Sequence, residues 1–171
     1  MYFGTPRITY LQRSFAGSSD EVFKVLAGLR NCRVDSVVIE KRKAAPAIRE
    51  LERFYPLMVG NLLKYPFDPR GIDVSQYGKV FVFLDRAGSG SRQPEALIKG
   101  VKHYLARHLS GVPYVICMHQ AKSHPYLQMV DYASWAIYVK WERGERRPYG
   151  AIAHLVKSAF PIFSHGFKDW Y

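Results

Sequence analysis

An acidic residue lies inside one of the most apolar stretches of the chain. Residues Pro125–Arg143 read PYLQMVDYASWAIYVKWER, and Asp131 stands in the middle. Leu127, Val130, Ser134, Ile137, Tyr138 and Trp141 recur there at spacings of three and four, which is typical of a helix packed on a core. We therefore predict one helix over Pro125–Arg143. Because an unpaired buried carboxylate is costly, Asp131 must be balanced by a cation, a metal ion or water.

Metal chemistry is one way to balance that charge. A second acid, Asp85, directly follows the apolar segment Lys79–Leu84. Mg²⁺ prefers carboxylates together with phosphate oxygens and water, and a pair of such ions can clamp the reacting oxygens of a phosphodiester. The predicted ligands of Mg²⁺ or Mn²⁺ are Asp85, Asp131 and Glu40. The predicted catalytic set adds two residues that could hold a phosphate or position water, Lys41 and His119.

Charge points to a polyanionic partner. The chain has 25 Lys and Arg against 14 Asp and Glu, a net charge of +11. Such an excess predicts attraction to nucleic acid. The residues expected to contact it are Lys41, Arg42, Lys43, Arg86, Ser123 and Gln128. No apolar run approaches the roughly 20 residues of a membrane span, and residues 1–10 lack the apolar core of a secretory signal, so we expect a cytoplasmic protein without membrane contact.

Each of these residues also has a purely structural interpretation. An acid directly after a strand often forms a turn, and Asp131 could pair with Lys41 or Arg86. His119 could be an ordinary loop histidine, and Ser123 could simply cap a helix. The basic cluster at 41–43 could be a solvated loop.

The elements that must position these residues alternate along the chain. Helices are expected from Ser18 or Ser19 to about Arg30, over Ala44–Lys64 with a kink or break at Pro56, over Pro94–His108, Pro125–Arg143 and Tyr149–Phe160. Buried strands are expected over Asp35–Glu40, Lys79–Leu84 and Tyr114–Met118. This alternation predicts an α/β fold with a largely parallel sheet. Because functional residues gather beyond the carboxyl ends of such strands, Glu40, Asp85 and His119 should share one sheet edge.

A resemblance to a known family adds to this interpretation. The segment YLQMVDYASWA at 126–136, followed by KWERG at 140–144 and Tyr149, resembles the C-terminal signature of the bacterial family called domain of unknown function 3800. The residues that match are Ser123, Leu127, Gln128 and Asp131. The strand ends VVIEK at 37–41 and LDRAGS at 84–89 are similar as well. The resemblance spans about Phe15–Phe160, and it implies a ribonuclease H-like fold with metal-dependent cleavage of nucleic acid.

The chain departs from that family at its N-terminus. Members open with a strand carrying Asp-Glu-Ser-Gly, which supplies the first metal carboxylate, whereas residues 1–15 contain no Asp or Glu. The resemblance thus implies one ribonuclease H-like domain over 1–171 that lacks its N-terminal hairpin, with helices flanking a mostly parallel central sheet and an aromatic tail at 161–171. Because open sheet edges pair or become covered, we expect a second copy or a partner protein at that edge.

Three functions are compatible with these residues. A ribonuclease H-like nuclease would cleave phosphodiester bonds through Asp85 and Asp131. A catalytically degenerate module of the same fold would bind nucleic acid or protein instead, and the missing acidic strand favours this second function for the chain alone. A small-molecule α/β enzyme is the third, but the sequence carries no cofactor fingerprint.

Overall fold

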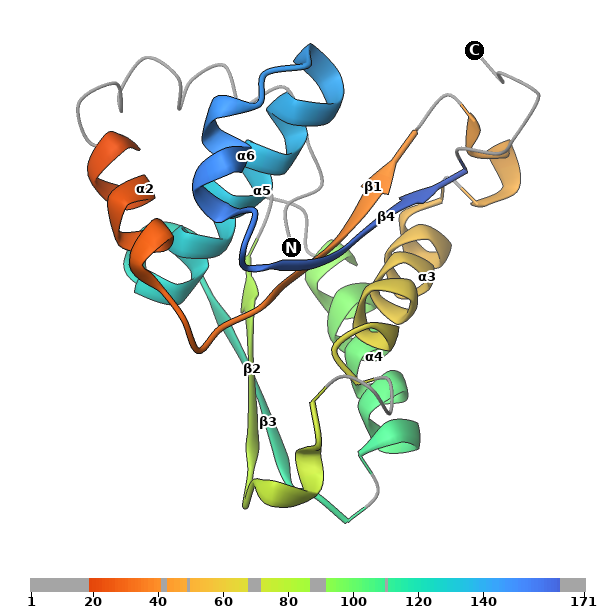
Figure 1. The fold of residues 1–171 in the computed structure, drawn as a ribbon. Helices are drawn as coiled ribbons and strands as arrows, with labels where there is room; N and C mark the ends of the chain where they lie inside the picture. The colour runs from red at the N-terminus through yellow and green to blue at the C-terminus, as the bar shows by residue number, and fades with distance from the viewer. Residues whose placement is uncertain are drawn as a thin grey trace. The chain divides into compact units, whose positions relative to one another are not determined.

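The computed structural model describes residues 19–40, 43–48, 50–67, 72–86, 92–109 and 111–163. The order of elements in them is α2 (Ser19–Gly28), β1 (Val34–Ile39), α3 (Leu51–Lys64), β2 (Val80–Asp85), α4 (Arg92–His108), β3 (Tyr114–His119), α5 (Pro125–Arg143), α6 (Arg147–Ile152) and β4 (Val156–Ile162) (Figure 1). Short 3-10 turns lie at Pro46–Ile48, Val74–Gln76 and Ala121–Ser123. The predicted mixed α/β class is confirmed.

Strands β1 and β4 form one parallel pair. The Val34 N–H donates to the Leu155 carbonyl at 2.8 Å, and the Glu40 N–H donates to the Ile162 carbonyl at 3.5 Å, so residue numbers rise together along both strands. Strand β4 corrects the predicted helix over 149–160, which ends at Ile152 as α6 and gives way to a strand from Val156. The partner that stabilises β4 lies far away in sequence, and helical periodicity cannot reveal such a partner.

Strands β2 and β3 form a second parallel pair, with α4 between them in sequence. The Val80 N–H donates to the Pro113 carbonyl at 2.9 Å at the start of both strands. Parallel neighbours require such a crossover, because both strands must begin at the same side of the sheet. The carboxyl ends of these two strands, at Asp85 and His119, therefore lie at one edge of this sheet. The single central sheet of a ribonuclease H-like fold stays a prediction.

The described residues fall into two compact units. The first unit contains 19–34 and 119–157, and it is built from α2, α5 and α6. The second unit contains 35–118 and 158–163, and it holds α3, α4, β2 and most of the remaining strand residues. Each unit has buried apolar side chains of its own.

Helix α5 supplies most of the core of the first unit. Its buried face is shared by Ala133, Ala136 and Ile137, at spacings that place them side by side on a helix. From α2, the Phe23 ring lies 5.9 Å from the Tyr132 ring and 5.9 Å from the Trp135 ring. The predicted core stripe is therefore partly wrong. Leu127 and Ile137 are buried, but Val130, Tyr138 and Trp141 are 42%, 36% and 49% exposed, because the small alanines form the packed face instead.

The ends of α5 agree with the prediction residue for residue. Pro125 occupies the first helical turn, where its missing N–H costs nothing. At the other end Gly144 adopts φ 68°, a left-handed conformation, and its N–H donates to the Val139 carbonyl. In the last turn of α5, Lys140 Nζ lies 3.5 Å from the centre of the Tyr149 ring, which ties α5 to α6.

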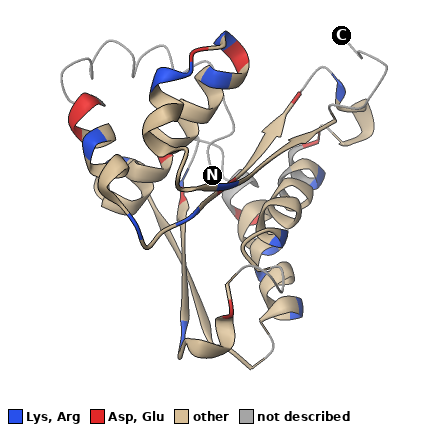
Figure 2. Cartoon of the chain, viewed as in Figure 1, with Lys and Arg blue, Asp and Glu red and all other residues tan. Residues whose placement is uncertain are grey.

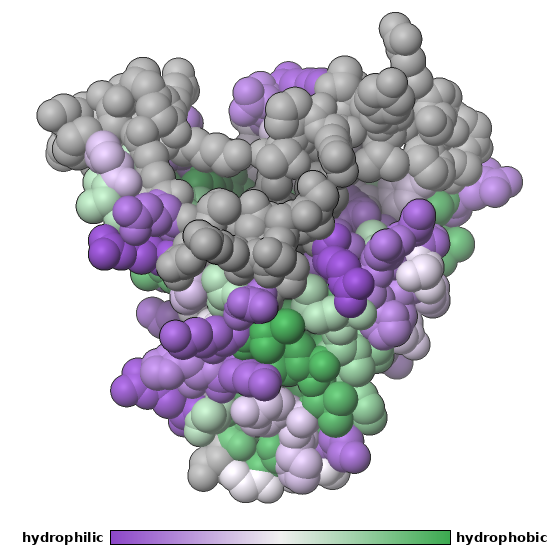
Figure 3. Space-filling model, turned by 180° about the vertical axis from the view of Figure 1, so that it is seen from behind, coloured by the Kyte–Doolittle hydropathy of each residue, from purple (hydrophilic) through white to green (hydrophobic). Residues whose placement is uncertain are grey.

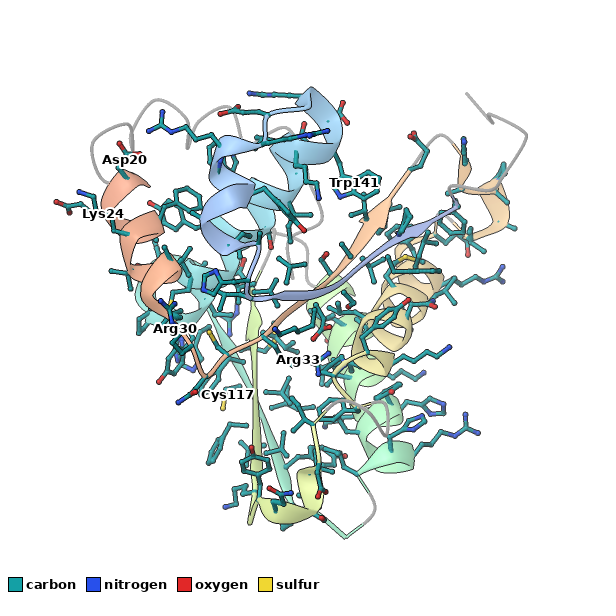
Figure 4. All side chains as sticks on the ribbon, in the orientation of Figure 1. Asp20, Lys24, Arg30, Arg33, Cys117 and Trp141 are labelled. Carbon is teal, nitrogen blue, oxygen red and sulfur yellow. The ribbon has the colours of Figure 1, made fainter. Side chains whose placement is uncertain are left out.

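Helix α2 ends at Gly28, slightly earlier than predicted. Arg30 Nη1 donates to the carbonyls of Ala27 at 2.8 Å and Leu29 at 3.0 Å (Figure 4). A cationic side chain that satisfies the last carbonyls of a helix is a usual way to terminate it. Arg30 therefore belongs to the cap rather than to the helix.

Helices α3 and α4 pack closely in the second unit. Their buried side chains are Met58, Val59, Leu97, Val101 and Leu105. A Cβ placed on Gly100 of α4 would come within 2.9 Å of Pro56 Cα in α3, so only glycine fits at this crossing. Helix α3 begins at Leu51 rather than at Ala44, and it runs through Pro56 without a break. The 3-10 turn Pro46–Ile48 precedes it.

Strands β1 and β2 are less buried than their apolar sequences predict. Every residue of β1 is half-buried. In β2, Leu84 is 4% exposed whereas Phe81 is 57% exposed, with its ring stacked 6.5 Å from that of Phe83. The chain thus leaves apolar side chains in contact with solvent, and Figure 3 shows an apolar area among hydrophilic residues on one face. Within the described part of the chain, no helix has the length and apolar character needed to cross a bilayer.

Candidate functional site

The polar turn before α5 is held together by its own side chains. Ser123 Oγ donates to the Gln120 carbonyl at 2.8 Å, and Gln128 Nε2 donates to the Lys122 carbonyl at 2.9 Å. Ser123 and Gln128 were both predicted to contact nucleic acid. In the structure, they fix the course of the chain into α5, and both remain exposed at its N-terminal end.

Two imidazoles border the same turn. The rings of His119 and His124 lie 5.0 Å apart, and the His124 ring lies 5.6 Å from that of Tyr126. His119 is exposed and His124 is half-buried. The predicted catalytic residue His119 is therefore the last residue of β3, just before this turn, and it is exposed to solvent.

Asp131 lies in α5, about one turn after Gln128, and it belongs to the first unit. Its side chain is half-buried, and so is that of Trp135 one turn later. Asp131 lies beyond the first turn of the helix, so the helix dipole contributes little to balancing its charge. The side chain is partly exposed to solvent, so water remains one of the ways in which its charge can be balanced.

The remaining predicted acids belong to the second unit. Asp85 is the last residue of β2 and is half-buried, and the exposed Arg86 follows it. Glu40 directly follows β1, and its carbonyl accepts from the Lys43 N–H at 3.1 Å. Lys43 is half-buried. Lys41 and Arg42 lie outside the described residues, as do residues 1–15 and most of the predicted tail.

The predicted metal ligands are therefore distributed over both units. Asp131 belongs to the first, and Asp85 and Glu40 belong to the second. Among the described residues, no three His, Cys, Asp or Glu side chains are grouped as a metal site would require. A site for Mg²⁺ or Mn²⁺ at Asp85, Asp131 and Glu40 stays a prediction.

A cationic surface on α4 was missed by the sequence analysis. Four exposed side chains recur at helical spacing along this helix, Lys99, Lys102, His103 and Arg107. We call them the α4 basic face. The sequence could have revealed this surface, because residues at these spacings lie on one side of the helix predicted over 94–108.

No protein-family model, curated protein or solved structure was found to match this chain. The resemblance to a ribonuclease H-like family therefore stays a prediction from the sequence.

Proposed function

We propose that this chain binds nucleic acid through the phosphate backbone. The observation that carries the proposal is its net charge of +11. Figure 2 shows Lys and Arg on helices and loops in many parts of the chain. Binding to the phosphate backbone of a nucleic acid depends mainly on surface cations, because each contact with a phosphate releases counterions from the nucleic acid.

Several described cations support the proposal because they lie at the surface. Lys122 of the first unit is exposed, and so are the four side chains of the α4 basic face of the second. Surface cations of this kind neutralise phosphates without a cost of burial. Since phosphates carry no sequence information, we expect shape and backbone recognition rather than base reading.

The experiment is a titration of the purified chain into a short fluorescein-labelled DNA duplex, an RNA duplex and an oligothymidylate, followed by anisotropy. Saturable binding of at least one probe, displaced by unlabelled nucleic acid, is the expected result. The absence of binding to all three at low salt would reject the proposal.

A second candidate function is metal-dependent cleavage on a ribonuclease H-like fold. The observation that favours it is the position of Asp85 at the carboxyl end of a parallel strand, where such folds place functional residues. With Asp131 and Glu40, it would bind Mg²⁺ or Mn²⁺, and the metal would activate water for attack on the phosphorus. Lys41 and His119 would hold the phosphate or transfer a proton.

Calorimetry with Mg²⁺ and Mn²⁺, together with a nuclease assay, tests this second function. Wild type is compared with Asp85→Asn and Asp131→Asn, and with Asp35→Asn as the control for loss of a carboxylate elsewhere. Metal binding and cleavage that vanish in the first two variants and persist in the control are expected. If the wild type binds no metal ion, the second function is rejected and the non-catalytic binding module remains as the proposal.

A further inference from the structure

Helix α4 is strongly divided into two faces. The α4 basic face lies in solvent, because Lys99, Lys102, His103 and Arg107 are all exposed. The opposite side of the helix is apolar and packs against α3 through Leu97, Val101 and Leu105, which are 8%, 0% and 0% exposed. The helix is therefore anchored rigidly by one side while it presents cations on the other.

The charge of this face is hardly compensated. Glu95 is the single acid in α4, and it lies one turn before Lys99. The four side chains of the α4 basic face form no hydrogen bond and no ion pair with any residue that the structure describes. The helix dipole favours Arg107 in the last turn. That effect does not extend to Lys99 and Lys102, which lie further from the helix end.

The dimensions of the face match a nucleic-acid strand. From Lys99 to Arg107 the helix rises about 12 Å. One strand of a duplex places about three phosphates along that length of its axis. Lys and Arg at helical spacing can therefore each reach a different phosphate, while the solvent-exposed position keeps the cost of desolvation small.

We infer that the α4 basic face is the surface that holds the phosphate backbone. The inference rests on the proposed function, since it names the surface through which nucleic acid is bound. The two lysines and the arginine supply the permanent charge of this face, and the exposed His103 lies among them. Contacts of this kind give affinity without sequence preference.

The test compares two triple variants by anisotropy against the same labelled duplex and oligothymidylate. The first removes the permanent charges of the face, Lys99→Gln, Lys102→Gln and Arg107→Gln. The second removes as many exposed cations elsewhere, Lys24→Gln, Arg143→Gln and Arg146→Gln, which lie in or beside α2 and α5. Circular dichroism and thermal unfolding confirm that both variants are folded, as expected for exposed positions.

The first variant should bind on the order of 100-fold more weakly near 0.1 M salt, and its log–log salt slope should fall by about 2 to 3. The control variant should retain most of the affinity and the slope. If both variants lose affinity equally, or if neither does, the inference is wrong although the proposed function stands. A wild type that binds no probe would reject the proposed function itself.

Discussion

The carboxylate of Asp73 is held by donors from the turn that follows it. Ser75 Oγ donates to Asp73 Oδ1 at 2.6 Å, Gln76 Nε2 donates to Oδ2 at 2.9 Å, and the Ser75 N–H donates to Oδ1 at 3.1 Å. These bonds favour the ionised form, so they lower the pKa of Asp73 below its ordinary value, with Ser75 as the main cause. Because the pKa of Asp73 is lower in the folded state, its carboxylate stabilises the turn at pH values above the pKa that Asp73 has in the unfolded chain. That contribution is lost as pH falls through the folded value.

Ser75→Ala should therefore raise the pKa of Asp73 toward that of a free carboxyl group, because the shortest bond disappears. The measurement is a carboxyl titration by NMR. Ser36→Ala is the control, since the Ser36 hydroxyl donates to the Ser158 carbonyl instead. An Asp73 pKa that is the same in Ser75→Ala and wild type would show that the hydroxyl does not hold the carboxylate.

Gly144 ends α5 in the left-handed conformation, with φ 68°. A Cβ is disfavoured in that conformation, so Gly144→Ala should destabilise the fold by about 1 kcal/mol. Gly150→Ala in α6 is the matched control, because Gly150 has no positive φ and nothing lies within 4 Å of its added Cβ. That variant should be neutral or slightly stabilising. Denaturant midpoints report both, and equal stability of the two variants would contradict the role of Gly144.

At the scale of elements, the contact between α3 and α4 depends on a glycine. Gly100→Ala places a methyl group 2.9 Å from Pro56 Cα and 3.2 Å from Pro56 Cβ. Because one of these atoms belongs to the backbone, the helices must separate. We expect destabilisation of about 1 to 3 kcal/mol despite the better helix propensity of alanine.

Gly60→Ala in α3 isolates the propensity effect, since nothing lies within 4 Å of its added Cβ. It should stabilise the fold by up to about 1 kcal/mol. Opposite signs for Gly100→Ala and Gly60→Ala in chemical unfolding would support the close crossing. A stabilising Gly100→Ala would show that α3 and α4 are further apart than described.

The elements that sequence predicts well are those with local signals. The spacing of apolar residues predicts α5 over Pro125–Arg143, and local signals agree with these bounds, since a proline begins the helix and Gly144 terminates it. Strand β4 was assigned to a helix because its stabilising partner, β1, lies far away in the chain. The apolar pattern also predicted the buried side of α5 incorrectly. Ala133 and Ala136 contribute little to such a pattern, but their small side chains allow close packing.

For the candidate site, the structure tests the predicted positions of residues along the strands and helices. Asp85 and His119 were expected at strand ends and lie there. Contact of Ser123 and Gln128 with nucleic acid stays a prediction, and the structure adds that their side chains donate to neighbouring carbonyls. Such local hydrogen bonds depend on backbone geometry, which residue type and spacing do not specify.

At the scale of the whole molecule, self-association at an open sheet edge stays a prediction. The sheets of the described residues have two strands each, and unpaired strand edges readily accept another chain. Static light scattering over a wide range of protein concentration should show a mass that rises above that of the monomer. A constant monomeric mass would exclude a second copy as the partner.

The positive charge of the whole chain is the basis of the central claim, that this protein binds nucleic-acid backbones. The most direct measurement is the affinity of the wild type for a short DNA duplex and for an oligothymidylate as a function of salt concentration. Because phosphate contacts release counterions, the logarithm of the affinity should fall linearly with the logarithm of salt, with a slope of about −0.9 or −0.7 per contact for duplex and single strand. An affinity that does not change with salt would contradict the claim.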